Sequence, residues 1–144
     1  MKLAAKVTIF PLIAVASIAA ALLFLDKENM EIGAPAAKGD LIRVISPRPD
    51  DIISSPVLVE GEARGFWFFE ASFPIRLFDA GGNELAVKPV QAIGEWMTED
   101  FVPFKLILNF PVPDSGTGTL VLEKDNPSGL PEYADELRIP VRFR

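Results

Sequence analysis

Between residues 41 and 144, apolar and polar residues alternate in short runs that Pro, Gly, Asp and Asn separate. Successive side chains of a β-strand point to opposite faces, so this alternation predicts strands that bury one face. A surface helix would instead place its apolar residues three or four positions apart. The alternation therefore predicts an all-β domain built from short antiparallel strands.

The clearest hairpin signal is the turn Ala80-Gly81-Gly82-Asn83, which separates the runs 69–78 and 84–90. Further strands are predicted at residues 41–45, 57–63, 104–110, 117–124 and 137–143. About seven strands in a domain of about 100 residues are typical of an immunoglobulin-like antiparallel β-sandwich. A domain of this size buries enough apolar surface to fold without a disulfide.

Two prolines fall inside the predicted strands, at Pro74 and Pro140. Proline has no backbone N–H to donate to a neighbouring strand, so we expect both at sheet edges or at β-bulges. Arg138, Arg142 and Arg144 alternate with the apolar residues of the last strand and are expected to face solvent.

The segment from residue 7 to residue 25 contains no charged side chain. As a helix it would nearly span the hydrocarbon core of a bilayer. Lys2 and Lys6 precede it and Asp26 follows it, so the positive-inside rule places the amino terminus in the cytoplasm. We predict an N-terminal transmembrane helix within residues 1–25, which anchors the chain to the cell membrane in a single pass.

After the predicted anchor, residues 26–40 are small and polar without periodicity, which predicts a flexible linker to an extracytoplasmic domain at residues 41–144. A cleaved signal segment, which would release a secreted protein, is an alternative because Ala19-Ala20-Ala21 offers small residues for cleavage. The apolar run continues beyond that site, which favours the anchor. A buried core helix is the third alternative, although the run has no polar face.

The chain contains no cysteine and no histidine. It therefore lacks the residues for a disulfide, a thiolate zinc site or a cysteine nucleophile, and the usual general base near neutral pH. Its formal net charge of −6 disfavours nucleic acid as a partner. Adjacent acids at residues 50–51, 99–100 and 135–136 show no EF-hand spacing. We predict no metal, no cofactor and no catalysis.

Two aromatic features and one turn-rich loop are candidate contact sites. Four successive aromatics at residues 66–69 cannot all face the core of a strand, so one or two of them are expected on the surface. Trp96 either closes one end of the sandwich or lies exposed beside carboxylates, and the loop at residues 126–131 is rich in turn residues. The candidate contact residues are Phe66, Trp67, Phe68, Trp96, Asn126 and Ser128.

Several separated segments are similar to those of a known family. They are Ile45-Ser46-Pro47, Ser54-Ser55-Pro56, Gly61-Glu62-Ala63-Arg64-Gly65, Phe69-Glu70-Ala71, Gly94-Glu95-Trp96-Met97 and Leu122-Glu123-Lys124-Asp125-Asn126-Pro127-Ser128-Gly129. In this order they resemble the immunoglobulin-like domain of bacterial spore germination proteins, over residues 41–144. The resemblance implies an immunoglobulin-like fold, a bacterial envelope setting and no catalytic residues.

These observations favour a non-catalytic interaction module at the outer side of the membrane, with an envelope protein as its partner. The alternative is binding of cell-wall glycan, because exposed aromatic rings stack on sugar faces.

Overall fold

The structure is a computed structural model that describes residues 38–144. These residues form one compact unit. The predicted anchor and most of the predicted linker lie outside the described residues. Among residues 38–144, no helix is long and apolar enough to cross a membrane.

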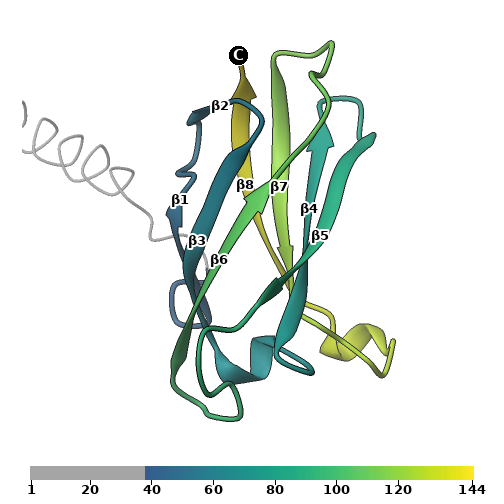
Figure 1. Ribbon diagram of the computed structural model, residues 1–144. Coiled ribbons are helices and arrows are strands. Elements are labelled where there is room, and N and C mark those ends of the chain that lie inside the picture. Colours follow the sequence, from purple (N-terminus) through teal and green to yellow (C-terminus); the bar gives the residue numbers. More distant parts are fainter. Residues whose placement is uncertain (1–37) are drawn as a thin grey trace, which may run out of the picture. The chain divides into compact units, whose positions relative to one another are not determined.

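The described residues form a β-sandwich of two sheets (Figure 1). The three-stranded sheet has the order β1 (Ile42–Ser46), β3 (Val57–Arg64), β6 (Phe101–Leu108). The five-stranded sheet has the order β2 (Ile52–Ile53), β8 (Glu136–Phe143), β7 (Thr117–Glu123), β4 (Ser72–Asp79), β5 (Glu84–Gln91). Two short 3-10 helices, η1 (Gly65–Trp67) and η2 (Pro131–Tyr133), lie in the connections. The all-β prediction is confirmed.

The core lies between the two sheets and follows the alternation of the sequence. In β4, Phe73, Ile75 and Leu77 are fully buried, and the intervening residues are partly exposed. Val121 departs from the pattern because it faces outward from β7 and is still only 2% exposed. Arg76 and Arg138 stand directly opposite it on the neighbouring strands. Arginine commonly lays its aliphatic stem over apolar surface and keeps its charged end in water, which accounts for the burial of Val121.

The structure contains one strand more than the sequence predicts. β2 has two residues and pairs in parallel with β8, with Ile52 opposite Arg142, so β1 and β2 belong to different sheets. Two residues are too few for an alternating pattern, and this strand depends on pairing with the distant β8.

The expectation that Pro74 lies at an edge or a bulge is wrong, because β4 lies between β7 and β5. Pro74 stands opposite Pro89 of β5, and the pairing of β4 with β7 begins only at Ile75. The missing N–H therefore falls where the ladder with β7 has already ended. Pro140 lies in β8, likewise inside the sheet and beyond the two residues that pair with β2.

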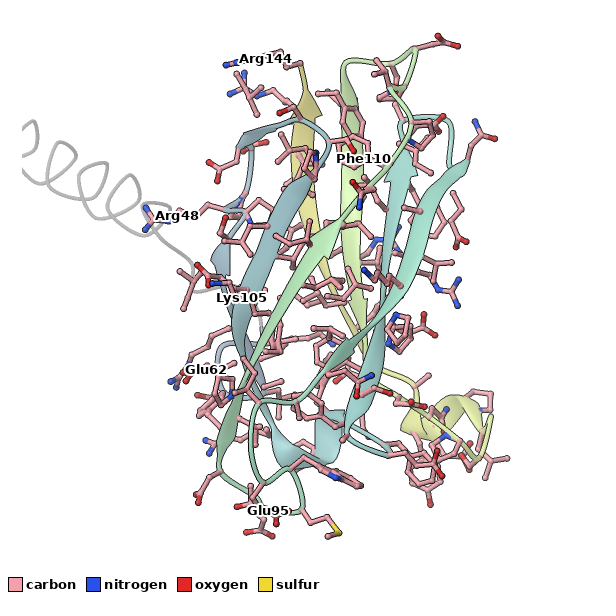
Figure 2. The ribbon with its side chains drawn as sticks, viewed as in Figure 1. Arg48, Glu62, Glu95, Lys105, Phe110 and Arg144 are labelled. Carbon is pink, nitrogen blue, oxygen red and sulfur yellow. The ribbon has the colours of Figure 1, made fainter. Side chains whose placement is uncertain are left out.

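The sandwich has two dissimilar ends (Figure 1). The connections at residues 65–71, 92–100 and 124–135 lie at one end, which we call the loop end. The β4–β5 turn, the β6–β7 connection and the carboxyl terminus lie at the other, which we call the far end. Figure 2 shows Glu95 at the loop end and Phe110 and Arg144 toward the far end.

Candidate functional site

Three connections meet at the loop end, with the η1 segment in the middle. The backbone N–H of Gly65 donates to the carbonyl oxygen of Asp100 (3.1 Å), and that of Asp125 donates to the carbonyl of Trp67 (3.0 Å). Only glycine fits at position 65, because a Cβ there would lie 1.9 Å from the carbonyl oxygen of Thr98. The close approach of residues 96–98 to η1 thus depends on that glycine.

The four successive aromatics divide between core and surface, as expected from their number. Trp67 is 0% exposed and Phe68 is 3% exposed, whereas Phe66 and Phe69 are 50% and 42% exposed. Phe68 packs edge-on against Phe73 (ring centroids 5.0 Å apart). Trp67 and Phe68 are therefore core residues, and the structure leaves them unavailable to a ligand.

The indole of Trp67 also carries a buried donor. Among residues 38–144, its Nε1 has no hydrogen-bond partner. Trp96 packs against the core and remains partly exposed, so it closes part of the loop end and contributes to its surface.

The β7–β8 connection is held by its own side chains. Asn126 Nδ2 donates to the carbonyl of Leu130 (2.9 Å), and Ser128 Oγ donates to Asn126 Oδ1 (2.6 Å). The backbone N–H of Leu130 donates back to Ser128 Oγ (3.2 Å). Asn126 and Ser128 therefore shape this connection through hydrogen bonds within it, whereas Ser128 itself is exposed.

Besides Phe69 of the aromatic run, four exposed apolar residues of the loop end were not among the sequence candidates: Ile93, Met97, Leu130 and Tyr133. Each lies in a turn-rich connection, where no periodicity separates a surface residue from a core residue. An apolar side chain in such a connection is only a weak signal of a contact site in the sequence. The connections come together only when the chain folds.

A hollow of about 460 Å³ lies beside the β7–β8 connection, on the outer face of the five-stranded sheet. We call it the loop hollow, and its lining includes Pro74, Glu123, Asp125, Asn126, Asp135 and Glu136. Three of its carboxylates form ion pairs: Glu123 with Arg76, Asp135 with Lys38 and Glu136 with Arg138. Within residues 38–144, Asp125 has no ion-pair partner.

The environment of Asp125 disfavours its negative charge. Burial raises the pKa of the Asp125 carboxyl, and the nearby charges of Glu123 and Glu70 raise it further. A hydrogen bond from the backbone N–H of Asn126 offsets part of this effect. Lys124, the basic residue of the lining, directs its Nζ to the carbonyl of Tyr133 (3.4 Å).

A second hollow of about 470 Å³ lies on the same sheet at the far end, and we call it the turn hollow. Its lining includes Phe78, Asp79, Gly82, Gly118, Thr119 and Arg138. Asp79 Oδ1 accepts hydrogen bonds from the backbone N–H groups of Gly81 and Asn83, both at 2.9 Å. The side-chain amide of Asn83, followed by its backbone N–H, lowers the pKa of the Asp79 carboxyl.

Of the three pairs of adjacent acids in the sequence, the pair at residues 50–51 lies apart from the other two. Asp50 and Asp51 lie beside β8 at the far end, where Asp50 donates its N–H to the carbonyl of Pro140 (2.8 Å). Asp100 belongs to the loop end. Across residues 38–144, no group of three or more acidic residues is arranged to hold a metal ion.

The comparisons with known proteins agree with this architecture. No curated protein matches the chain. A family model described as the immunoglobulin-like domain of bacterial spore germination matches residues 41–129, from the start of the sandwich into the β7–β8 connection. Since this match covers more than half of the sequence and the structure has the expected two-sheet β-sandwich, the chain belongs to the family of immunoglobulin-like domains of bacterial spore germination.

Proposed function

We propose that this protein is a membrane-anchored, extracytoplasmic interaction module of the bacterial envelope and that its loop end binds an envelope protein. One observation carries the proposal. More than half of the exposed large hydrophobic side chains of residues 38–144 lie on the three connections of the loop end. They are Phe66, Phe69, Ile93, Met97, Leu130 and Tyr133. Exposed apolar side chains gathered at one place are typical of an interaction surface.

The start of the described chain is held against the loop end. Lys38 forms an ion pair with Asp135, Arg43 Nε donates to the carbonyl of Gly39 (2.7 Å), and Arg64 Nε donates to that of Asp40 (2.9 Å). With residues 1–25 as the anchor, the intervening residues 26–37 reach at most about 40 Å. The loop end would then lie within that distance of the membrane, which favours a membrane protein as its partner.

The chemistry of the side chains supports a non-catalytic role. The chain has no histidine or cysteine. Of the carboxylates around the loop hollow, Glu123, Asp135 and Glu136 are held in ion pairs with Arg76, Lys38 and Arg138. Binding of cell-wall glycan is the competing function, because Phe66, Phe69 and Tyr133 expose aromatic rings.

Site-specific photo-cross-linking of the full-length protein in its native membrane tests the proposal. Benzoylphenylalanine is introduced in place of Met97 or Tyr133 at the loop end. Matched controls place it at Val112 or Ile52, which are exposed apolar residues of the far end. Adducts are identified by mass spectrometry, and the same sample shows whether residues 1–25 are retained.

We expect one protein to be cross-linked reproducibly from Met97 and Tyr133 and not from Val112 and Ile52. Wall fragments at the loop-end positions would overturn the protein-binding proposal in favour of glycan binding. Equal or absent adducts at both ends would contradict an interaction at the loop end. Loss of residues 1–25 from the mature chain would contradict the anchor and favour the secreted form.

A further inference from the structure

Building on the proposed function, we infer that the loop end binds a polypeptide segment in which Lys or Arg stands beside apolar side chains. The loop hollow takes the cationic side chain, which pairs with Asp125. Leu130 and Tyr133, at the rim, contact the apolar side chains of the same segment. The inference deepens the proposed function by naming the chemistry of the partner.

Asp125 is the carboxylate of the loop hollow that has no ion-pair partner within residues 38–144. It lines a hollow whose other carboxylates, Glu123, Asp135 and Glu136, each have a basic partner. Asp125 has none within the described part of the chain, and its pKa is raised first by burial and then by the charges of Glu123 and Glu70. A cation delivered into the hollow would supply the opposite charge that the fold does not provide.

The loop hollow suits a long side chain with a charged end in both its size and its lining. Its volume of about 460 Å³ is ample for one long side chain, and its lining combines apolar groups such as Pro74 and Ala134 with carboxylates. Lys and Arg have the matching construction, because an apolar stem carries a charged group at its end. Asn126 lines the same hollow and adds an amide that can hydrogen-bond the segment.

The β7–β8 connection also supplies an apolar rim. Leu130 and Tyr133 are 47% and 54% exposed. The hydrogen bond from Asn126 Nδ2 to the carbonyl of Leu130 and that from Lys124 Nζ to the carbonyl of Tyr133 tie both residues to the wall of the hollow. A free cation would not use this rim, whereas a polypeptide with neighbouring apolar side chains would bury it.

The charge of the loop end excludes polyanionic occupants. Its carboxylates outnumber its basic groups, Lys38, Arg64 and Lys124, and all three of these already have acceptors within the domain. The carboxylates are Asp40, Glu70, Glu95, Glu99, Asp100, Asp125, Glu132 and Asp135. Nucleic acid and anionic lipid headgroups would be repelled. On the three-stranded sheet, by contrast, Glu60 is paired with Lys105 and Glu62 with Arg43.

Peptide binding by the full-length protein in a neutral detergent tests the inference. The probe is a fluorescent twelve-residue peptide that repeats Arg-Leu-Lys-Trp. Two matched peptides replace both Arg and Lys by citrulline, the neutral isostere of Arg, or replace Leu and Trp by Ser. Asp125→Asn is compared with Asp114→Asn, an exposed far-end substitution with the same change in charge. Fluorescence anisotropy gives the Kd values.

We expect Asp125→Asn to weaken binding about tenfold, since a hydrogen-bonded charge pair in a partly buried site is lost. Asp114→Asn should change the Kd less than about twofold. Both modified peptides should bind more weakly than the probe. In ¹⁵N spectra, the probe should shift the amide signals of Asn126, Gly129 and Ala134 and leave Gly82 and Thr119 of the turn hollow unmoved.

Equal effects of the two substitutions, or full binding of the citrulline peptide, would overturn the inference. Signals that move only outside the loop hollow would do the same. If photo-cross-linking from Tyr133 still identifies a protein partner, only the assigned chemistry fails. If neither experiment detects contact at the loop end, the proposed function fails as well. Circular dichroism melts of the variants separate a lost contact from a lost fold.

Discussion

The loop hollow and the turn hollow have nearly equal volumes and lie on the same sheet face, but their aspartates are in opposite electrostatic states. Asp79 is bound by the amides of its own turn, which lower its pKa. Asp125 is partly buried near Glu123 and Glu70, which leaves its pKa raised. The carboxylate of Asp79 is therefore bound within its own turn, whereas that of Asp125 has no ion-pair partner among residues 38–144.

This difference follows from the length of the two connections. A four-residue turn is short enough for one Asp side chain to satisfy its backbone N–H groups, and that bonding selects Asp and Asn there. The β7–β8 connection is longer and uses Asn126 and Ser128 for its internal hydrogen bonds. Asp125 precedes those bonds and contributes its backbone N–H to the carbonyl of Trp67.

The largest expected effect concerns one aromatic side chain at each end of the sandwich. Trp67 is fully buried, so Trp67→Ala should lower the free energy of unfolding by about 3–5 kcal/mol. Phe143, which is half-buried at the far end, should cost about 1–2 kcal/mol when replaced by Ala. Urea unfolding followed by circular dichroism measures both. Equal losses would show that the two ends are supported alike.

The next effect compares two glycines that are required for different reasons, one for lack of space and the other for its backbone conformation. Gly118 lines the turn hollow, and a Cβ there would lie 2.4 Å from the carbonyl oxygen of Phe78, so Gly118→Ala should cost about 1–3 kcal/mol. Gly129 lines the loop hollow in open space with φ +66°, so Gly129→Ala should cost only about 1 kcal/mol.

Gly116→Ala is the matched control for these two glycines, because its added Cβ meets no neighbour within 4 Å. Its effect should stay within about 0.5 kcal/mol. Thermal unfolding of the three variants under one condition ranks them. A larger loss for Gly129→Ala than for Gly118→Ala would contradict the close packing described at the far end.

The smallest effects should have opposite signs for the two aspartates. The lowered pKa of Asp79 stabilises the fold above the ordinary aspartate pKa of about 4, and this contribution is lost as the pH falls through the lowered value. Asp79→Ala should therefore destabilise at neutral pH, and its difference from the unmodified protein should shrink in acid.

Asp125 has a raised pKa, so the proton is bound more tightly in the folded state. The resulting stabilisation is present below the ordinary pKa and disappears as the pH rises through the raised value. Asp125→Asn should therefore stabilise slightly at neutral pH, and this gain should vanish in acid. Melting temperatures across pH 3–7 would test it, and a destabilising Asp125→Asn would mean that the fold already pairs this carboxylate.

Much of the fold could be predicted because alternation is a local property of the chain. The alternation within the run 69–78 puts Phe73, Ile75 and Leu77 on one face of a strand, and that face is buried. The turn at Gly81-Gly82 joins a hairpin, as the sequence predicts. β2 could not be predicted, because its two residues become a strand only through β8. The position of Pro74 inside a sheet likewise depends on where the ladder with β7 ends.

The candidate site was less predictable, for a physical reason. The sequence correctly required part of the segment 66–69 to face solvent, but which rings do so was decided by tertiary packing, as in the contact of Phe68 with Phe73 of β4. Trp67 and Phe68 were taken by the core. Met97 and Tyr133 lie in connections without periodicity, and they share one end of the molecule only because the strands between them are antiparallel.

The amino-acid sequence by itself determined the all-β class, the hairpin, the inward faces of the strands and the absence of cysteine and histidine chemistry. These follow from side-chain identity and from the two-residue period of a strand, both of which are local. The tertiary structure alone decided which three connections meet, which aromatics remain exposed and that Asp125 has no ion-pair partner among the described residues. Burial and charge pairing depend on residues that are distant in the sequence, so only the assembled sheets could specify them.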